Sequence, residues 1–417
     1  MEVKWCIKLL LLVDGPAGMM AAIQAAKHGN KVTLLEKMRT PGRKLSITGK
    51  GRGNLTNNVD ISEFTKNVPG NGKFLYSAFS QFTNKDLVAY FNSLGVDTKV
   101  ERGERIFPVS DTAMSFVNAL KKELNKYKVD IKVNSSVAKI LTNENIVIGV
   151  QLDNKEIIEC DKLVLATGGK SYSTTGSDGS GYKLASNLGH TIIEPKGSLI
   201  PLETYEKYDL QGLALKNVSI SVLDDSKNIY DDFGEMIFTH FGVSGPIILS
   251  SSAHILRIKN LEEKLKDKRI KIVLDLKPAL DDEKLAQRIK RDFEKFTKKQ
   301  FKNSLSDLLP SKMIPEIIKL SKIDPEKQVN QISKKEIDNL VNSLKRFPIT
   351  VKKFRPIEEA IITAGGVSVK EINPHTMESK LIKGLYFAGE IIDVDAYTGG
   401  FNLQIAFSTG YVAGQLL

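Results

Sequence analysis

The first 36 residues combine an apolar run, closely spaced glycines and an acidic residue, a pattern that can hold a nucleotide. Residues 7–13 are mostly apolar, Gly15 and Gly18 follow, and a second apolar run ends at Glu36. Gly15 permits a pyrophosphate to approach the backbone, Gly18 permits close packing of helix on strand, and Glu36 can bind a ribose hydroxyl. This order of features predicts an ADP-containing cofactor. The alternative is an ordinary strand–helix–strand unit that uses its glycines for packing alone.

The turn in this pattern departs from the usual Gly-x-Gly-x-x-Gly spacing. Val13 stands at the first glycine position, where a β-branched side chain fits a tight turn poorly. Asp14 adds a negative charge beside the expected pyrophosphate. These two residues predict a weaker pyrophosphate contact rather than a different fold.

A second glycine-rich segment, residues 42–57, also carries several cations. Arg43, Lys44, Lys50 and Arg52 could neutralise phosphate groups and donate hydrogen bonds to the polar edge of a ring. The alternative is a basic surface loop. We disfavour that interpretation because few apolar residues would order the segment without a ligand.

Two further glycine-rich segments, residues 167–181 and 389–402, each follow a short apolar run that is typical of a buried strand. Ligands of open parallel sheets bind beyond the carboxyl ends of the strands, so four glycine-rich strand ends predict an extended ligand. Gly399 and Gly400 precede a predicted helix whose N–H groups would favour negative charge, as in a reduced flavin. Asp393 could bind ribityl hydroxyls or simply cap its loop.

The elements that must position these segments alternate between strands and helices up to about residue 189, which is typical of α/β folds. Residues 130–141 and 146–152 are predicted to form a pair of strands. Residues 195–275 alternate as antiparallel strands do, and residues 278–346 have helical spacing. The α/β domain is therefore expected to be interrupted by an insertion and completed by the C-terminal segment.

The composition is that of an ordinary globular protein, with 417 residues of which 41% are hydrophobic and 26% charged. Two cysteines, Cys6 and Cys160, give neither a disulfide framework nor a metal-ligand spacing, so we expect a cytoplasmic protein without a metal site. The apolar N-terminal run is too short to span a bilayer and leads directly into the glycine turn. We interpret it as a buried strand.

The net charge of +11 is concentrated in one part of the chain. Residues 253–347 contain 24 Lys and Arg against 15 Asp and Glu, a net charge of +9. Such a stretch could bind nucleic acid or a membrane surface. Aromatic residues are sparse there, so we interpret it as a solvated helical face and expect neither partner.

The glycine-rich segments and other motifs along the chain resemble those of the three-domain bacterial flavoproteins that include the aminoacetone oxidases and the BaiN-like proteins. The matching segments are residues 15–18, 42–57, 105–108, 166–182, 234–246, 364–367, 376–380 and 389–402. The resemblance implies a Rossmann-like FAD-binding domain, interrupted by an inserted β-barrel-like domain and a small helical domain. The expected bounds are 1–190 for the first part of the FAD-binding domain, 191–277 for the β-rich substrate domain, 278–345 for the helical domain and 346–417 for the return.

The strand-end rule and the resemblance together predict the residues that bind FAD. They are Gly15, Pro16, Ala17, Gly18, Glu36, Lys37, Arg43, Lys44, Gly51, Arg52, Asn54, Val137, Ala166, Thr167, Gly168, Gly389, Glu390, Asp393, Gly400, Phe401 and Asn402. The family has glycine where this chain has Val13 and Asp14, and usually cysteine where this chain has Gly53. No thiol chemistry is therefore expected at position 53.

Catalytic residues are not fixed by any motif, because flavin chemistry needs no protein nucleophile. The candidates for a proton relay or a substrate anchor are His240, Tyr172 and Tyr397. A lone histidine is about as often a structural residue, so His240 could equally serve the fold.

Three functions fit these features, each with FAD as cofactor. The first oxidises a small amine or aminoketone with O₂ as acceptor. In the second, NAD(P)H reduces FAD, which then acts on a carbonyl or C=C bond. The third is a flavin-containing protein that binds or modifies nucleic acid. No second strand–glycine–helix unit is present, which favours the oxidase and leaves NAD(P)H as a transient reductant. We expect a small-molecule substrate, and the oligomeric state stays open.

Overall fold

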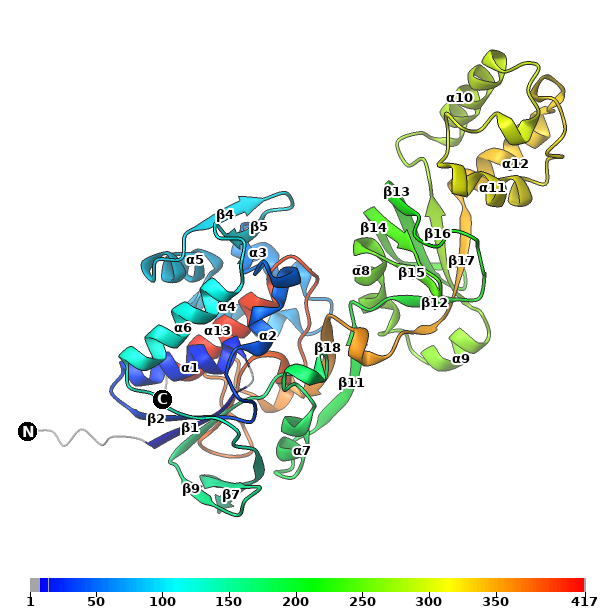
Figure 1. The fold of residues 1–417 in the computed structure, drawn as a ribbon. Helices are drawn as coiled ribbons and strands as arrows, with labels where there is room; N and C mark the ends of the chain where they lie inside the picture. Colours follow the sequence, from blue (N-terminus) through cyan, green and yellow to red (C-terminus); the bar gives the residue numbers. More distant parts are fainter. Residues whose placement is uncertain (1–7, 14, 416–417) are drawn as a thin grey trace, which may run out of the picture. The chain divides into compact units, whose positions relative to one another are not determined.

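The computed structural model describes residues 8–13 and 15–415, with the side chain of Val13 left out, and the chain divides into two compact units (Figure 1). The discontinuous unit comprises the chain up to Ser198 and again from Pro356, and the inserted unit comprises Leu199–Arg355. The predicted organisation, an α/β domain interrupted by an insertion and completed by the C-terminal segment, is confirmed.

A five-stranded parallel sheet forms the centre of the discontinuous unit, with strand order β19-β10-β1-β2-β6. Its strands are β1 (Lys8–Val13), β2 (Lys31–Glu36), β6 (Asp130–Lys132), β10 (Lys162–Ala166) and β19 (Leu385–Phe387). Residues 9–12 and 163–166 are buried, as expected for central parallel strands covered on both faces. The sheet is of the Rossmann type that the sequence predicts.

The predicted pairing of residues 130–141 with 146–152 is correct only in its second half. The segment forms two strands: β6 joins the parallel sheet beside β2, and β7 (Val137–Asn143) pairs with β8 (Ile146–Leu152). The break falls at Asn134, whose φ of +53° lies in the left-handed region and cannot continue a strand. The alternating pattern alone does not reveal this break, because both halves have strand character.

Helices α1 (Pro16–Lys27) and α13 (Phe401–Gln415) pack directly on each other. A Cβ atom at Gly410 would lie 2.2 Å from the carbonyl oxygen of Ala17, and one at Gly414 would lie 2.3 Å from that of Ala21. The two glycines therefore permit a close approach between the first and last helices of the unit. Because α13 follows β19 and α1 follows β1, this contact fixes two of the strand-end loops relative to each other.

Smaller elements complete the discontinuous unit. The sheets β3-β5-β4, β7-β8-β9 and β11-β18 are antiparallel. Their remaining strands are β3 (Thr56–Asn57), β4 (Thr98–Glu101), β5 (Arg105–Pro108), β9 (Ile157–Glu159), β11 (Ile192–Ser198) and β18 (Ile362–Val367). The remaining helices are α2 (Arg43–Ser46), α3 (Ile61–Phe64), α4 (Tyr76–Gln81), α5 (Asn84–Ser93), α6 (Met114–Lys126) and α7 (Ser180–Ser186).

The inserted unit is built on a closed antiparallel barrel of order β12-β15-β14-β13-β16-β17. Its strands are β12 (Leu202–Thr204), β13 (Ala214–Asp224), β14 (Lys227–Phe238), β15 (Gly242–Ser244), β16 (Ile270–Asp275) and β17 (Phe347–Phe354). Alternate residues of β13, such as Val218, Ile220 and Val222, are buried, so the predicted antiparallel alternation is confirmed. Helices α8 (Pro246–Ile255) and α9 (Leu261–Lys266), which the strand-like alternation does not predict, also lie in this region.

Three helices lie between the paired strands β16 and β17, as the helical spacing of residues 278–346 predicts. They are α10 (Asp282–Lys295), α11 (Ile314–Ser321) and α12 (Lys334–Lys345). Side chains cap two of them: Asp281 accepts a hydrogen bond from Lys284 N, and Ser333 and Glu336 form a reciprocal capping box. Among the described residues, no helix is long and apolar enough to cross a membrane.

Candidate functional site

Four adjacent strands of the parallel sheet each end in a glycine-rich loop. Strand register places the end of β1 at Val13 opposite both Ala166 of β10 and Glu36 of β2, and it pairs Leu165 of β10 with Phe387 of β19. The carboxyl ends of the four strands therefore meet at one edge of the sheet. The loops converge there as their sequence positions predict, at the edge where open α/β sheets bind ligands.

The loop after β1 leads straight into the N-terminus of α1. Gly15 is the N-cap residue and no described side chain caps its helix, so N–H groups of the first turn can face an anion. A Cβ atom placed on Gly15 would have no neighbour within 4 Å in the described part of the chain, which leaves space there for a ligand against the backbone. Asp14, the predicted misplaced charge, lies outside the described residues.

Glu36 ends β2 and is 1% exposed. Its Oε1 accepts a hydrogen bond of 2.8 Å from Met38 N, and the carbonyl oxygens of Glu36 and Met38 accept hydrogen bonds from Ser135 N and Asn134 N. These bonds bring the segment before Val137, another predicted cofactor residue, next to the end of β2. The adjacent Lys37 forms an ion pair of 2.6 Å with Asp178, which joins the loops after β2 and β10.

A charged network connects the second, third and fourth loops. Lys44 Nζ lies 2.5 Å from Glu390 Oε2 and 3.0 Å from Ser171 Oγ, and Ser171 Oγ donates to Glu390 Oε1 at 3.0 Å. Glu390 Oε1 also accepts from Thr363 N at 2.9 Å. A Cβ atom at Gly169 would lie 2.6 Å from Glu390 Oε1, so the network requires glycine there.

Thr167 carries a buried hydroxyl that has no hydrogen-bond partner among the residues that the structure describes. It follows β10 directly, and a Cβ atom at Gly181 would lie 1.9 Å from its Oγ1. A buried hydroxyl without a partner costs roughly 1–3 kcal/mol, so such a group at a ligand edge suits a polar atom of the ligand. Together with the open space at Gly15 and the uncapped N-terminus of α1, this hydroxyl fits FAD, whose site these loops would form.

The predicted cation Arg52 is held by other protein groups. It forms ion pairs of 2.5 Å with both Glu101 and Asp111, and its guanidinium lies 4.3 Å from the centre of the Phe107 ring. Hydrogen bonds from Arg52 lower the pKa of Glu101, and those from Lys99 and Arg52 lower the pKa of Asp111. Arg52 is thus neutralised where it lies, whereas Arg43 lies in α2 beside Lys44.

Asn54 and Gly400 fix the turn that precedes α13. With its amide oxygen toward Gly400, Asn54 accepts a hydrogen bond of 3.0 Å from Gly400 N and donates to the carbonyl oxygen of Thr56. Gly400 has a φ of +98°, and a Cβ atom there would lie 2.3 Å from the Thr56 carbonyl. Glycine is therefore required at this point of the loop on both conformational and steric grounds. Gly51, by contrast, has a φ of +84° with open space around it.

The other predicted residues of the last loop bind within the protein. Asn402 exchanges hydrogen bonds of 2.7 and 2.8 Å with the backbone of Ala396, and Phe401 packs edge-on against Phe64. Asp393 Oδ2 accepts a hydrogen bond of 2.9 Å from Asn71. Gly389 has a φ of +76° and lies against Ala17 at the start of α1. These contacts shape the loop before α13, a helix whose first-turn N–H groups have no partner within the helix itself.

The three catalytic candidates fall in different places. Tyr172 is 38% exposed and has a φ of +55°, which is rare for a residue with a bulky side chain. Tyr397 lies in the last loop, where its N–H donates to the Asn67 carbonyl oxygen. His240 is exposed on the loop between β14 and β15 of the inserted unit, with its ring against Phe241.

Sequence reasoning missed two members of the charged network, Ser171 and Thr363. Ser171 is fully buried, and Thr363 Oγ1 accepts hydrogen bonds from Lys170 N and Ser171 N at 2.8 and 3.1 Å. Ser171 lies within the motif at residues 166–182, but nothing in that motif singles out its hydroxyl. Thr363 immediately precedes the motif at residues 364–367, and this proximity is the one signal that could have indicated it.

Comparison with known proteins identifies the family. The family described as "HI0933-like protein Rossmann domain" matches residues 8–416. The 3-dehydro-bile acid delta(4,6)-reductase of Clostridium scindens is 32% identical over 410 residues, which is 97% of each chain. The ribosomal RNA dihydrouridine synthase of Haemophilus influenzae is 30% identical over 405 residues, which is 96% of each chain.

A solved structure also aligns with the chain. The open conformation of a flavocytochrome c3 fumarate reductase is 16% identical, covers 98% of this chain and 77% of its own, and has a TM-score of 0.49. The family match over nearly the whole chain and the two long relatives decide the assignment. The chain belongs to the HI0933-like Rossmann family and is an FAD-dependent oxidoreductase.

Proposed function

We propose that this protein reduces a C=C bond conjugated to a carbonyl group, with electrons that a reduced nicotinamide delivers to FAD. In this reaction a hydride is added to the β carbon and a proton to the α carbon, while NAD(P)H is oxidised to NAD(P)⁺. FAD, when bound, supplies the hydride. The chain would supply cofactor binding, substrate orientation and a route for the proton.

The reactions for which the two relatives are named support this proposal. One is a delta(4,6)-reductase of a 3-dehydro-bile acid, and the other makes dihydrouridine, which is uridine with two hydrogens added across its ring C=C bond. In both substrates the C=C bond that is reduced is conjugated to a carbonyl group. The substrates differ greatly in size and polarity, so the shared chemistry supports the reaction type more strongly than any one substrate.

The described site is compatible with this chemistry. The N-terminus of α13 places partial positive charge at the strand ends, which favours the negative charge of a reduced flavin, whereas Lys44 is neutralised by Glu390. Tyr172 is partly exposed and carries a hydroxyl that could hand a proton to the α carbon. Tyr182, in contrast, is buried, and burial raises the pKa of its hydroxyl well above the usual range, so it stays protonated.

Oxidation of a small amine or aminoketone by O₂ is the competing function. It is favoured by one observation: the sequence has no second strand–glycine–helix unit for a nicotinamide. Under the reductase proposal the nicotinamide must therefore dock transiently at the FAD site itself. The two functions differ in which compound reduces the enzyme and which reoxidises it.

Anaerobic mixing of the FAD-loaded protein with NADH, NADPH and aminoacetone in turn separates the two functions. The reductase proposal expects a nicotinamide to bleach the flavin absorbance. A 3-oxo-4,6-diene bile acid or a uridine-containing ribosomal RNA fragment should then restore it without O₂. Bleaching by aminoacetone alone, followed by H₂O₂ production on admitting air, would overturn the proposal in favour of the oxidase.

A further inference from the structure

A basic stretch of the inserted unit begins in the second half of α10 and extends past the end of that helix. Residues 288–302 contain seven Lys and Arg but only two Asp and Glu. The acidic residues at the start of the helix, Asp281, Asp282 and Glu283, lie in or beside its first turn, where they favour helix formation. The N-terminal turn of α10 is therefore acidic, and the basic stretch runs from Arg288 to Lys302, past the end of the helix at Lys295.

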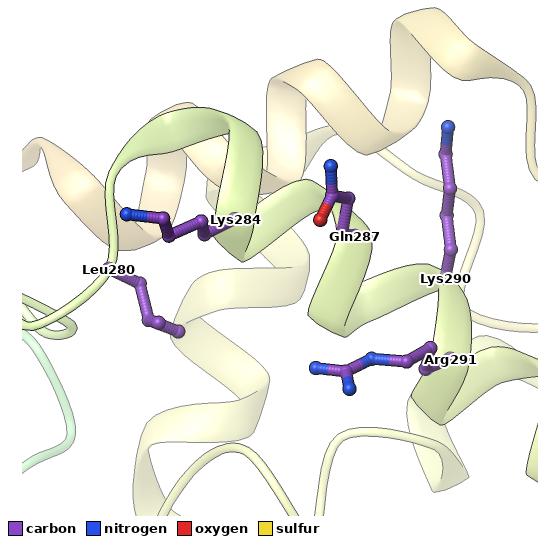
Figure 2. A pocket seen from close by; sticks show the side chains of 5 residues that line it. All are labelled: Leu280, Lys284, Gln287, Lys290 and Arg291. Atoms are coloured by element: carbon purple, nitrogen blue, oxygen red, sulfur yellow. The ribbon is translucent and has the colours of Figure 1, made fainter.

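Part of this basic stretch borders a hollow. Four residues of α10 and Leu280, just before it, line an open depression of about 510 Å³ (Figure 2). The four are Lys284, Gln287, Lys290 and Arg291. The lining thus offers three cations and an amide with a single apolar side chain, which suits a polar anionic ligand rather than an apolar one.

Some Lys and Arg side chains around the hollow form ion pairs with carboxylates, and others do not. Arg288 Nε donates to Asp292 at 2.8 Å, and Lys284 lies 3.0 Å from Asp281. Lys290, Arg291 and Lys298 are exposed and form no ion pair with any part of the chain that the structure describes. An external anion would therefore meet cations whose charge no described carboxylate neutralises, and would gain their Coulomb attraction.

The surroundings of these cations indicate the kind of anion. None of the exposed large hydrophobic side chains lies between residues 278 and 346, so the described helices lack the apolar face that binds a membrane surface. Phe296, two positions before Lys298, is only partly buried, and Lys299 lies over its ring at 4.0 Å. Cations combined with a reachable ring are typical of surfaces that bind single-stranded nucleic acid.

We propose that the α10 basic face, defined as Lys284, Gln287, Lys290 and Arg291 of the hollow together with Lys298 just beyond the end of the helix, binds the sugar–phosphate backbone of a single-stranded nucleic acid. This inference goes beyond the proposed redox reaction and does not depend on it. Lys290, Arg291 and Lys298 contact phosphates, since they are the cations without protein partners among the described residues. A binding surface of this kind replaces the interpretation of the stretch as a merely solvated face.

The test measures binding by fluorescence anisotropy with the full-length, FAD-loaded protein. The probes are a fluorescein-labelled 20-nucleotide single-stranded RNA and the DNA of the same sequence, titrated between 50 and 300 mM KCl. Three phosphate contacts predict a slope of about −2 for log K against log salt concentration. The tighter of the two probes identifies RNA or DNA as the source of the backbone.

Matched variants locate the surface. The triple variant Lys290→Gln, Arg291→Gln, Lys298→Gln should bind at least about tenfold more weakly at 100 mM KCl, with a slope shallower by about 2. The variant Lys207→Gln, Lys216→Gln, Lys227→Gln makes the same change in net charge at exposed lysines elsewhere in the inserted unit and should bind normally.

Three results would overturn the proposal. They are no binding of either probe at 100 mM KCl, an equal loss of binding in both triple variants, and equally tight binding of polyglutamate or of vesicles containing phosphatidylserine. The binding readout requires no turnover, so its failure would leave the proposed reduction untouched. Failure of the flavin to react with nicotinamide would likewise leave the binding result intact.

Discussion

Lys44 Nζ lies 2.5 Å from Glu390 Oε2, a residue 346 positions away in the sequence, and this contact joins two glycine-rich strand-end loops. The side chains of Lys44 and Glu390 are only 17% and 11% exposed, so the pair is mostly removed from water. A mostly buried pair contributes little over two apolar residues, but removal of one partner is costly because the other charge remains. The pair therefore fixes the relative positions of the loops after β2 and β19.

Substitution of Lys44 should destabilise the protein and impair cofactor binding. We expect Lys44→Met to lower the free energy of unfolding by about 3 kcal/mol, because the Glu390 carboxylate stays buried without its cation. Urea unfolding of the apoprotein measures this change, and the flavin-to-protein absorbance ratio after purification measures FAD retention. Lys170→Met is the control, since that side chain is exposed. Equal stability and FAD content in the two variants would contradict this account.

The glycine-rich strand-end loops could be predicted from the sequence, whereas the Lys44–Glu390 contact between two of them could not. The loops are predictable because each follows a short apolar run, and parallel strands bring their carboxyl ends together. The Lys44–Glu390 contact is not, because it depends on the order of strands in the sheet. The same limit applies to Thr363, whose hydroxyl reaches the loop after β10 from β18. The break at Asn134 is missed because apolar alternation continues on both sides of it.

Alanine substitutions at two glycines should separate folding from cofactor binding. Gly15 has extended backbone, and the space that a Cβ atom there would enter is open, so Gly15→Ala should fold normally. If a pyrophosphate lies against Gly15, the added methyl group should weaken FAD binding about tenfold, which corresponds to about 1.4 kcal/mol. Titration of the apoprotein with FAD, followed by flavin fluorescence, measures this effect.

Gly400→Ala is the counterpart and should damage the fold itself. Its φ of +98° disfavours alanine, and the new Cβ would collide with the Thr56 carbonyl at 2.3 Å. We expect a lower midpoint of thermal unfolding for the apoprotein of this variant and an unchanged one for Gly15→Ala. A Gly15→Ala protein that retains FAD as tightly as the parent would show that the pyrophosphate lies elsewhere.

A buried histidine should make the protein sensitive to mild acid. His190 lies between Glu371 at 3.3 Å and Ser379 at 2.9 Å, with a fully buried side chain. Burial lowers the pKa of His190, and the neighbouring Glu371 offsets this only in part. The native state therefore resists protonation, whereas the unfolded chain accepts a proton below its ordinary pKa of about 6.5. Stability due to this residue is present above that pH and is lost as the pH falls below it.

His190→Gln should accordingly lose less stability than the parent between pH 7.5 and pH 5. The measurement is the difference between the thermal unfolding midpoints at the two pH values, taken for each protein separately. This difference is used because the substitution also alters packing against Phe387, which changes the midpoint at both pH values. His28→Gln is the control, because His28 is exposed. A pH dependence that is identical in the parent and in both variants would remove His190 as the cause.

The residues at the first turn, Val13 and Asp14, should limit the affinity for FAD. Val13 ends β1 opposite Ala166, directly before the open space at Gly15, and Asp14 adds a carboxylate to the segment that precedes the N-terminus of α1. A negative charge there opposes the pyrophosphate that the helix end attracts.

Replacement of both residues by glycine should tighten FAD binding, and Asp14→Asn alone should give the part that is due to charge. The difference between Asp14→Asn and the parent should shrink as salt is raised from 20 to 500 mM, because salt screens charge–charge interactions. Unchanged or weaker FAD binding in the double glycine variant would show that the turn already suits its ligand.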